Sequence, residues 1–260
     1  MRIGLISGTG TYDWPGLTER HIATNQYGEV EFSRGVVDGI ELLHLSRHGA
    51  GHARLSNQVN HRANLRALLD AEVDAVISLT VCGAVDRSLP LGSIIVFDDL
   101  YFPSNRMPDG SPCTWYSTPG EPGRGHWIFD EPFSDPLRRA LIEAAAATET
   151  PNRPAGCYGH VDGPRFNTRS EIAALGAVGV TAVSQTLGPE VVLAGEAELP
   201  IAGLGFATDY ATGVGSGGEE TLDSLAVRLR EAPQAFVRVV TAALPRIDKP
   251  APTGHVWRFD

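Results

Sequence analysis

The sequence predicts an α/β fold, and two observations support that class. Residues 182–212 run in the order strand, helix, strand: residues 182–185 are β-rich, residues 189–198 favour a helix, and residues 200–209 are apolar without a break. A strand that is apolar throughout indicates burial on both faces, which is typical of parallel strands covered by helices. The sequence therefore predicts a sheet with helices packed against it.

The remaining elements follow from the same patterns. The pair Asp38-Gly39 separates two β-rich runs and predicts a hairpin. Thr168 and Glu171 form a capping box and predict the start of a helix that runs to Ala177. Strands are expected at residues 2–7, 30–37, 40–46, 74–80, 93–97 and 157–161, further helices at 57–71, 135–148 and 219–244, and irregular loops at 101–126 and 213–218.

The domain organisation is expected to be simple. The chain has 260 residues, a length that fits one large α/β domain, and it contains neither an internal repeat nor a linker. We therefore predict one domain over residues 1–247, followed by a C-terminal tail over residues 248–260.

Composition excludes several classes of function. The formal charge of −10 argues against a nucleic-acid partner. The single lysine, Lys249, leaves no candidate for a Schiff base or a phosphate-binding loop of the GxxxxGK[ST] type. Cys82, Cys113 and Cys157 are too far apart in sequence for a zinc knuckle, so we expect no metal and a cytoplasmic location. No run of apolar residues is long enough to predict a membrane partner.

Polar residues follow several of the expected strands. Asp209 closes the apolar run 200–209, where burial would raise the pKa of its carboxyl group and suit it to act as a general acid. The alternative is that Asp209 only caps the following turn. Thr80 follows another buried strand, and Phe166 with Asn167 could offer a flat platform to a heterocycle, although most such aromatic residues pack into a core.

Two other strand ends have the chemistry of an anion site. Gly8-Thr9-Gly10 follows the first strand, as in loops that bind phosphate through backbone N–H groups. The third glycine of a dinucleotide fingerprint is missing, because Asp13 stands there. Arg47 and His48 offer a planar fork and a second donor to an oxyanion, or else form a solvated basic turn.

Six blocks in order resemble the 5′-methylthioadenosine phosphorylases, which belong to the trimeric branch of the purine nucleoside phosphorylase family. They cover the chain from Ile3 to about Ile247, and six ordered blocks are far more specific than any one alone. The blocks are Ser7-Gly8-Thr9-Gly10, Arg47-His48-Gly49, Thr80-Val81-Cys82-Gly83, Gly163-Pro164-Arg165-Phe166, Pro189-Glu190-Val191-Val192-Leu193-Ala194 and Ala207-Thr208-Asp209-Tyr210.

The resemblance implies a single-domain nucleoside phosphorylase fold with a central mixed sheet, partly closed into a barrel and flanked by helices. It implies phosphate-dependent cleavage of the glycosidic bond of a purine nucleoside, first of all 5′-methylthioadenosine or a related 5′-modified adenosine, by a cytoplasmic homotrimer or dimer of trimers that needs no cofactor. Asp209 would donate to purine N7. The implied phosphate-binding residues are Thr9, Arg47, His48, Thr80 and Thr186, and the implied nucleoside-binding residues are Phe166, Asn167, Gln185, Asp209 and Ala211.

Three positions depart from the family pattern. Gln185 stands where the family usually has a methionine beside the ribose, and Ala211 replaces the second aspartate of adenine-selective members. Asn167 replaces a common serine, and an amide can either donate to a 6-oxo group or accept from a 6-amino group. These positions leave open a phosphorylase of inosine, guanosine or methylthioinosine.

Three further alternatives remain. A nucleosidase would use water in place of phosphate, but Arg47, His48 and Thr186 argue against it. A non-catalytic nucleoside-binding member would account for Gln185 and Ala211. A dehydrogenase is disfavoured because the glycine fingerprint is incomplete.

Overall fold

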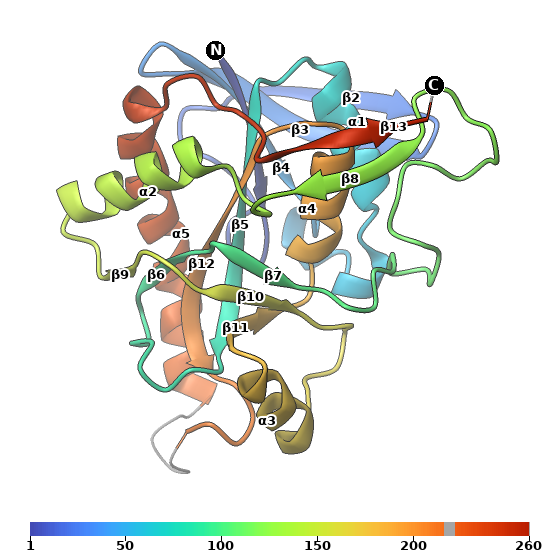
Figure 1. Ribbon diagram of the computed structural model, residues 1–260. Coiled ribbons are helices and arrows are strands. Elements are labelled where there is room, and N and C mark those ends of the chain that lie inside the picture. Colours follow the sequence, from blue (N-terminus) through green and yellow to red (C-terminus); the bar gives the residue numbers. More distant parts are fainter. Residues whose placement is uncertain (216–221, 260) are drawn as a thin grey trace.

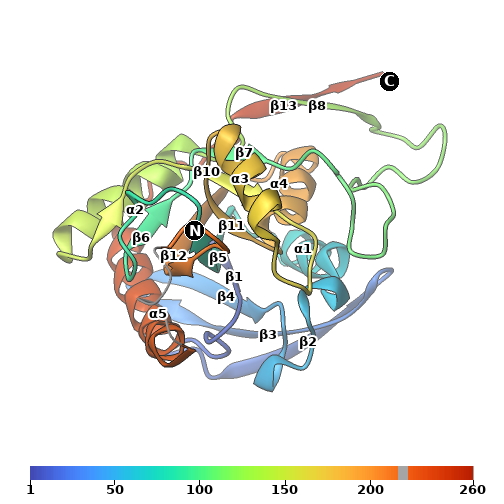
Figure 2. The same ribbon diagram turned by 90° about the horizontal axis from the view of Figure 1, so that it is seen from below.

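The computed structural model describes residues 1–215 and 222–259, and within them a mixed sheet of 11 strands forms the centre of the molecule. Its middle consists of four neighbouring parallel strands: β4 (Ile40–Ser46), β1 (Arg2–Ser7), β5 (Ala75–Ala84) and β12 (Ile201–Tyr210). These strands are apolar because helices cover both of their faces, as Figures 1 and 2 show. The predicted α/β class and mixed sheet are confirmed.

Strand β5 changes partners along one of its edges. It pairs with β1 from Ala75 to Ser78, and with the antiparallel strand β11 (Val180–Ser184) at Gly83 and Ala84. Between these two pairings, residues 79–82 border a gap where β1 ends and β11 has not yet joined. Crevices of this kind, beyond the carboxyl ends of parallel strands, are the usual ligand sites of α/β sheets.

Peripheral strands extend the sheet in three directions. Beyond β4 the sheet continues with β3 (Gly28–Val37) and β2 (Glu19–Asn25). Beyond β11 it continues with β10 (Cys157–His160) and β7 (Asp99–Tyr101), and beyond β12 with β6 (Ile94–Val96) and β9 (Asn152–Arg153). Strand β2 is absent from the sequence-based prediction. Its side chains are largely exposed, so it lacks the apolar run that marks a buried strand.

Helices cover the sheet in two layers. α1 (His61–Asp70) and α4 (Leu187–Glu196) lie on one face, and α2 (Asp135–Ala147) and α5 (Leu222–Ala243) on the other (Figure 2). The predicted helix 57–71 is shorter in the structure because Asn60 accepts from the Ala63 N–H and starts α1 at His61. The predicted start of the helix 219–244, and part of the loop 213–218, lie outside the described residues.

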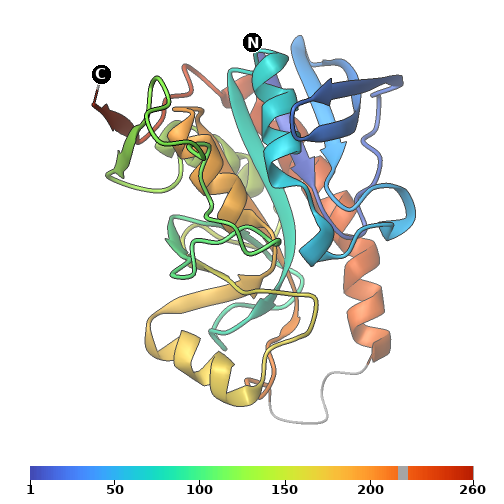
Figure 3. The same ribbon diagram turned by 90° about the vertical axis from the view of Figure 1, so that its right-hand side faces the viewer.

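Helix α3 (Arg169–Ala177) lies at the opposite end of the molecule from the β2–β3 hairpin (Figure 3). It begins with the predicted capping box, in which the Thr168 and Glu171 side chains each bind the other's backbone N–H. Three short 3₁₀ turns complete the described helical elements: η1 (Ala50–His52), η2 (Ser56–Gln58) and η3 (Leu244–Arg246).

The C-terminal tail is ordered against the long loop. β13 (Gly254–Arg258) pairs antiparallel with β8 (Gly125–Phe129), and together they form a two-stranded ribbon at the edge of the molecule (Figure 2). The loop 101–126 is irregular over most of its length, as predicted. Within the described residues, no helix is both long and apolar enough to cross a membrane.

Candidate active site

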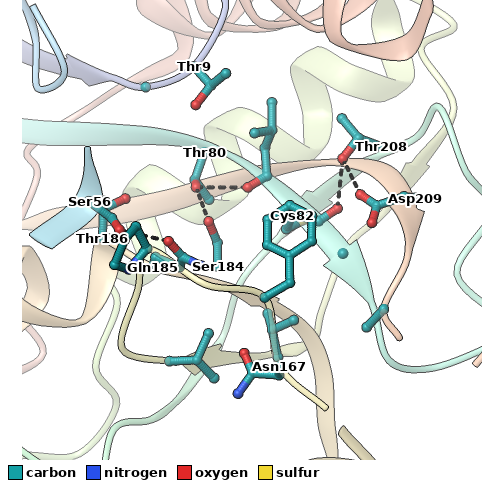
Figure 4. Close-up of a pocket in the computed structure, with 18 of the residues that line it drawn as sticks. Thr9, Ser56, Thr80, Cys82, Asn167, Ser184, Gln185, Thr186, Thr208 and Asp209 are labelled. Carbon is teal, nitrogen blue, oxygen red and sulfur yellow. Dashed lines mark hydrogen bonds between the residues drawn. The ribbon is translucent and has the colours of Figure 1, made fainter. Parts of the chain in front are cut away.

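A cavity of about 380 Å³ lies at the gap beside β5. This volume is within the range of small-molecule sites, about 300–1,000 Å³. The walls come from segments far apart in sequence: the ends of β1, β4, β5, β11 and β12, the segment before α3, and α5. Figure 4 shows ten of the lining residues with labels. All ten residues predicted for the site line it: Thr9, Arg47, His48, Thr80, Phe166, Asn167, Gln185, Thr186, Asp209 and Ala211.

Arg47 lines the cavity, but its planar fork faces the protein. Its Nε and one terminal nitrogen donate to the two carboxylate oxygens of Glu190 at 2.7 and 2.9 Å, and neither side chain is exposed. The other terminal nitrogen donates to the Leu79 carbonyl at 2.8 Å. A guanidinium has five N–H groups, so one N–H of that nitrogen remains. At most one N–H of the expected fork is therefore left to bind an anion.

Gly8 lies directly against the Arg47 guanidinium. A Cβ atom at Gly8 would lie 2.7 Å from the terminal nitrogen of Arg47 that binds Leu79. The glycine after β1 thus allows the backbone to pass directly over the guanidinium. The sequence shows the glycine, but the reason for it is visible only in the packing.

Glu190 does not line the cavity but holds Arg47 in place, a role that the sequence did not predict. It lies in the first turn of α4 and is fully buried. Burial raises the pKa of its carboxyl group, but Arg47 and the neighbouring His61, whose Nδ1 lies 3.5 Å from the carboxylate, together hold the pKa below its usual value. Ser78 also donates to Glu190 at 2.5 Å. A single glutamate in a predicted helix is expected on the surface, so the sequence does not predict the buried ion pair of Arg47 and Glu190.

His48 is a neutral imidazole. Burial, with the neighbouring Arg47 charge, lowers its pKa to about 4. Its Nδ1 lies 2.9 Å from the Arg54 carbonyl oxygen, which can only accept, so Nδ1 carries the hydrogen and Nε2 carries a lone pair. The expected second donor for an oxyanion is thus already used within the protein. The remaining ring nitrogen can accept a hydrogen bond from a protonated oxygen.

Hydroxyl groups line the same end of the cavity. The Thr80 hydroxyl donates to Ser184 at 3.0 Å, as Figure 4 shows. Thr186 precedes α4, and its side chain makes no capping bond to the helix. Thr9 lines the cavity from the loop after β1. Ser184 was missed because a serine at a strand end is common in any sequence.

Asp209 lies where β12 ends, as the sequence predicted. The pairing register of β12 with β5 shifts between Ala207 and Asp209, so a bulge at Thr208 turns the following residue. Bulges are common beside active sites because they redirect a side chain. The Thr208 hydroxyl lies 2.6 Å from Asp209 Oδ1 and 3.3 Å from the Cys82 carbonyl (Figure 4).

The platform residues lie at the other end of the cavity. Phe166 is 74% exposed, as expected for its place on a turn before α3. The Asn167 amide nitrogen donates to the Glu171 carboxylate at 3.3 Å. A carboxylate only accepts, so the amide orientation is defined, and its oxygen lies on the cavity side (Figure 4). Asn167 therefore presents an acceptor.

The other lining residues differ in character. Ala211 is 6% exposed and packs near Gly83, so this position presents no polar group. Three leucines, Leu55, Leu225 and Leu229, add apolar surface. Leu225 and Leu229 were not predicted because leucines in a helical pattern indicate core packing, and Leu55 was not predicted because a single leucine in a loop carries no signal. Among the described residues, no group of three histidine, cysteine or acidic side chains could hold a metal ion.

The fold and this cavity define an α/β protein with a small-molecule site at its strand ends. Residues 2–245 match the family model of the phosphorylase superfamily. The chain therefore belongs to this superfamily, and the predicted enzyme class is confirmed.

Individual relatives agree with that membership. A 6-oxopurine nucleoside phosphorylase of Pyrococcus furiosus is 33% identical over 95% of this chain and 94% of its own length. An S-methyl-5′-thioadenosine phosphorylase of Geobacter sulfurreducens is 29% identical over 95% and 86%. The methylthioadenosine phosphorylase of Schistosoma mansoni, solved with adenine, superposes with a TM-score of 0.85 at 26% identity, covering 94% of this chain and 90% of that one.

Proposed function

We propose that the protein transfers the sugar of a purine nucleoside to inorganic phosphate and releases the free base. The observation that carries the proposal is the joint placement of two sets of groups in one cavity. The first set comprises the hydroxyls of Thr9, Thr80 and Thr186 with Arg47 and His48, and the second comprises Asp209, Phe166 and Asn167. The chemistry of the first set suits a phosphate and that of the second a purine, the two groups that must meet at one ribose.

The groups present fit the proton requirements of this reaction. Hydrogen phosphate forms a bond to the anomeric carbon as the glycosidic bond breaks, and the bonding electrons leave with the purine. The phosphate loses one proton and the purine gains one, so the overall reaction is balanced. His48 Nε2 would accept from the phosphate hydroxyl, and Asp209 would supply a hydrogen at purine N7. Thr9, Thr186 and the Arg47 N–H would bind the other phosphate oxygens, and the Thr80 hydroxyl would join them by turning its hydrogen from Ser184 to the phosphate.

The preferred substrate is 5′-methylthioadenosine or a similar 5′-modified adenosine. The Asn167 oxygen is an acceptor, which suits the hydrogens of a 6-amino group. Leu55, Leu225 and Leu229 would surround an apolar group on the 5′ carbon of the sugar. The relatives from G. sulfurreducens and S. mansoni carry the corresponding name.

A 6-oxopurine nucleoside is the second candidate. Ala211 lacks the carboxylate that an adenine-selective site uses, and the Asn167 oxygen can also accept from N1–H of a 6-oxopurine. The P. furiosus relative, named for 6-oxopurine nucleosides, is 33% identical.

The test is base release from methylthioadenosine, adenosine, inosine and methylthioinosine, each with and without phosphate. We expect phosphate-dependent release of adenine, fastest from methylthioadenosine. Release from the two 6-oxo substrates alone would establish the second candidate. Release that does not need phosphate would indicate a nucleosidase, and tight binding without turnover would indicate a non-catalytic member.

We also propose that the protein forms a homotrimer, works without a cofactor and resides in the cytoplasm. The exposed Phe166 beside the cavity supports an assembly in which a neighbour covers it. The three free cysteines support a reducing compartment. Light scattering on the purified protein would give the subunit number.

A further inference from the structure

The amide of Gln185 connects three separate segments at the wall of the cavity. The Ser56 hydroxyl donates to Gln185 Oε1 at 2.7 Å, and Gln185 Nε2 donates to the Arg165 carbonyl at 3.0 Å. The carbonyl can only accept, so the amide orientation is fixed by chemistry. Figure 4 shows Ser56 and Gln185 meeting at the edge of the cavity. We call the two hydrogen bonds among Ser56, Gln185 and Arg165 the Gln185 bridge.

Gly163 packs directly on this bridge. A Cβ atom at Gly163 would lie 2.1 Å from both Gln185 Oε1 and Ser56 Oγ, so only a glycine fits there. Its backbone packs against the Ser56–Gln185 hydrogen bond, which is partly buried, whereas the Gln185–Arg165 hydrogen bond is exposed. In the lower dielectric of a partly buried position, the Ser56–Gln185 bond is the stronger of the two.

The bridge joins the two halves of the site. Ser56 follows the segment that carries Arg47 and His48, and Arg165 precedes Phe166 and Asn167. The Arg165 side chain binds Glu171 at 2.7 Å, and Glu171 accepts from Asn167. A continuous series of contacts therefore runs from Ser56 to the acceptor that faces the purine.

We propose that Gln185 is a positioning residue that holds the purine-binding segment, residues 163–167, at a fixed distance from the phosphate-binding segment, residues 47–56. This inference rests on the proposed function. A side chain without an amide could make neither hydrogen bond, so the connection between the two segments depends on Gln185. Because the two segments are already ordered before the substrates bind, less of the binding free energy is used to order them.

The test compares Gln185→Met, Ser56→Ala and the double variant in the full-length protein. Loss of the bridge should raise KM for the nucleoside about tenfold, as expected from two neutral hydrogen bonds, and change kcat much less. Because either substitution breaks the same connection, the effects should be less than additive. Ser117→Ala is the matched control, since it removes an exposed hydroxyl that, among residues 1–215 and 222–259, bonds only Glu121, and it should leave KM unchanged.

Hydrogen exchange of the backbone over residues 163–171 provides a second readout. It should become faster in Gln185→Met and Ser56→Ala, and stay unchanged in Ser117→Ala. Unchanged exchange, unchanged KM, or strictly additive KM effects would overturn the proposal. Because exchange needs no substrate, it decides whether the bridge orders the segment even if no nucleoside is cleaved, an outcome that would refute the proposed function instead.

Discussion

Asp209 is the residue on which the chemistry depends most. Its place at the end of β12 was predicted from the apolar run before it, because a polar residue that closes a buried strand lies at the edge where ligands bind. The bulge at Thr208 and the hydrogen bond from the Thr208 hydroxyl were not predictable, since both depend on the register with β5.

Asp209→Asn tests the role of that carboxyl group. An amide keeps the shape but cannot supply an acidic proton to the leaving purine. We expect kcat to fall by ~10²- to 10⁴-fold, the range for general acid catalysis, while KM changes little. Steady-state kinetics with the best nucleoside gives both constants, and a variant with undiminished kcat would remove Asp209 from the mechanism.

At the scale of elements, the arrangement depends on how α4 meets β4 and β5. Glu190, in the first turn of α4, binds Arg47 at the end of β4 and Ser78 within β5. The strands and helices themselves were largely predictable, because apolar runs and caps are local signals. The contact between Arg47 and Glu190 was not predictable, because the two residues are 143 positions apart and no local sequence pattern indicates that they are buried.

Glu190→Gln tests this connection. It leaves the buried Arg47 charge without a counterion, which costs about 3–5 kcal/mol when one partner of a buried pair is removed. We expect a lower free energy of unfolding in denaturant titration and a higher KM for phosphate. Ser78→Ala is the milder variant, because the ion pair persists and only one hydroxyl is lost, so a smaller change in the same direction is expected. Equal stability of wild type and Glu190→Gln would contradict the structural role.

Strands β2 and β13 were not predicted from the sequence, because neither has a local pattern that indicates a strand. β2 is polar and exposed, so it has no apolar run, and the tail gave no sign that β13 would pair with β8. Both are edge features whose order comes from neighbouring backbone rather than from their own side chains.

At the scale of the whole molecule, buried histidines connect stability to pH. Burial lowers the pKa of His44 and His48 to about 4 and that of His160 to about 3. In the unfolded chain these groups take up a proton near pH 6.5. The unfolded state therefore binds more protons between pH 6.5 and about pH 4, and stability falls as the pH is lowered through that window.

We expect the free energy of unfolding to fall between pH 7 and pH 5.5 by roughly 1 kcal/mol for each of these histidines. The midpoint of thermal unfolding should fall with it. Differential scanning calorimetry measures the trend. His44→Asn should flatten it, whereas His255→Asn, at an exposed position on β13, should not. A midpoint that is constant over this range would show that these imidazoles are not held neutral by burial.

The most direct test of the account is phosphorus NMR of a reaction that contains the protein, methylthioadenosine or inosine, and inorganic phosphate. The account predicts a new signal from a sugar 1-phosphate that grows in step with the free base, at one phosphate consumed for each base released. Base release with an unchanged phosphate signal would show that water attacks the sugar, and would contradict the assignment of Thr9, Arg47, His48, Thr80 and Thr186 to phosphate.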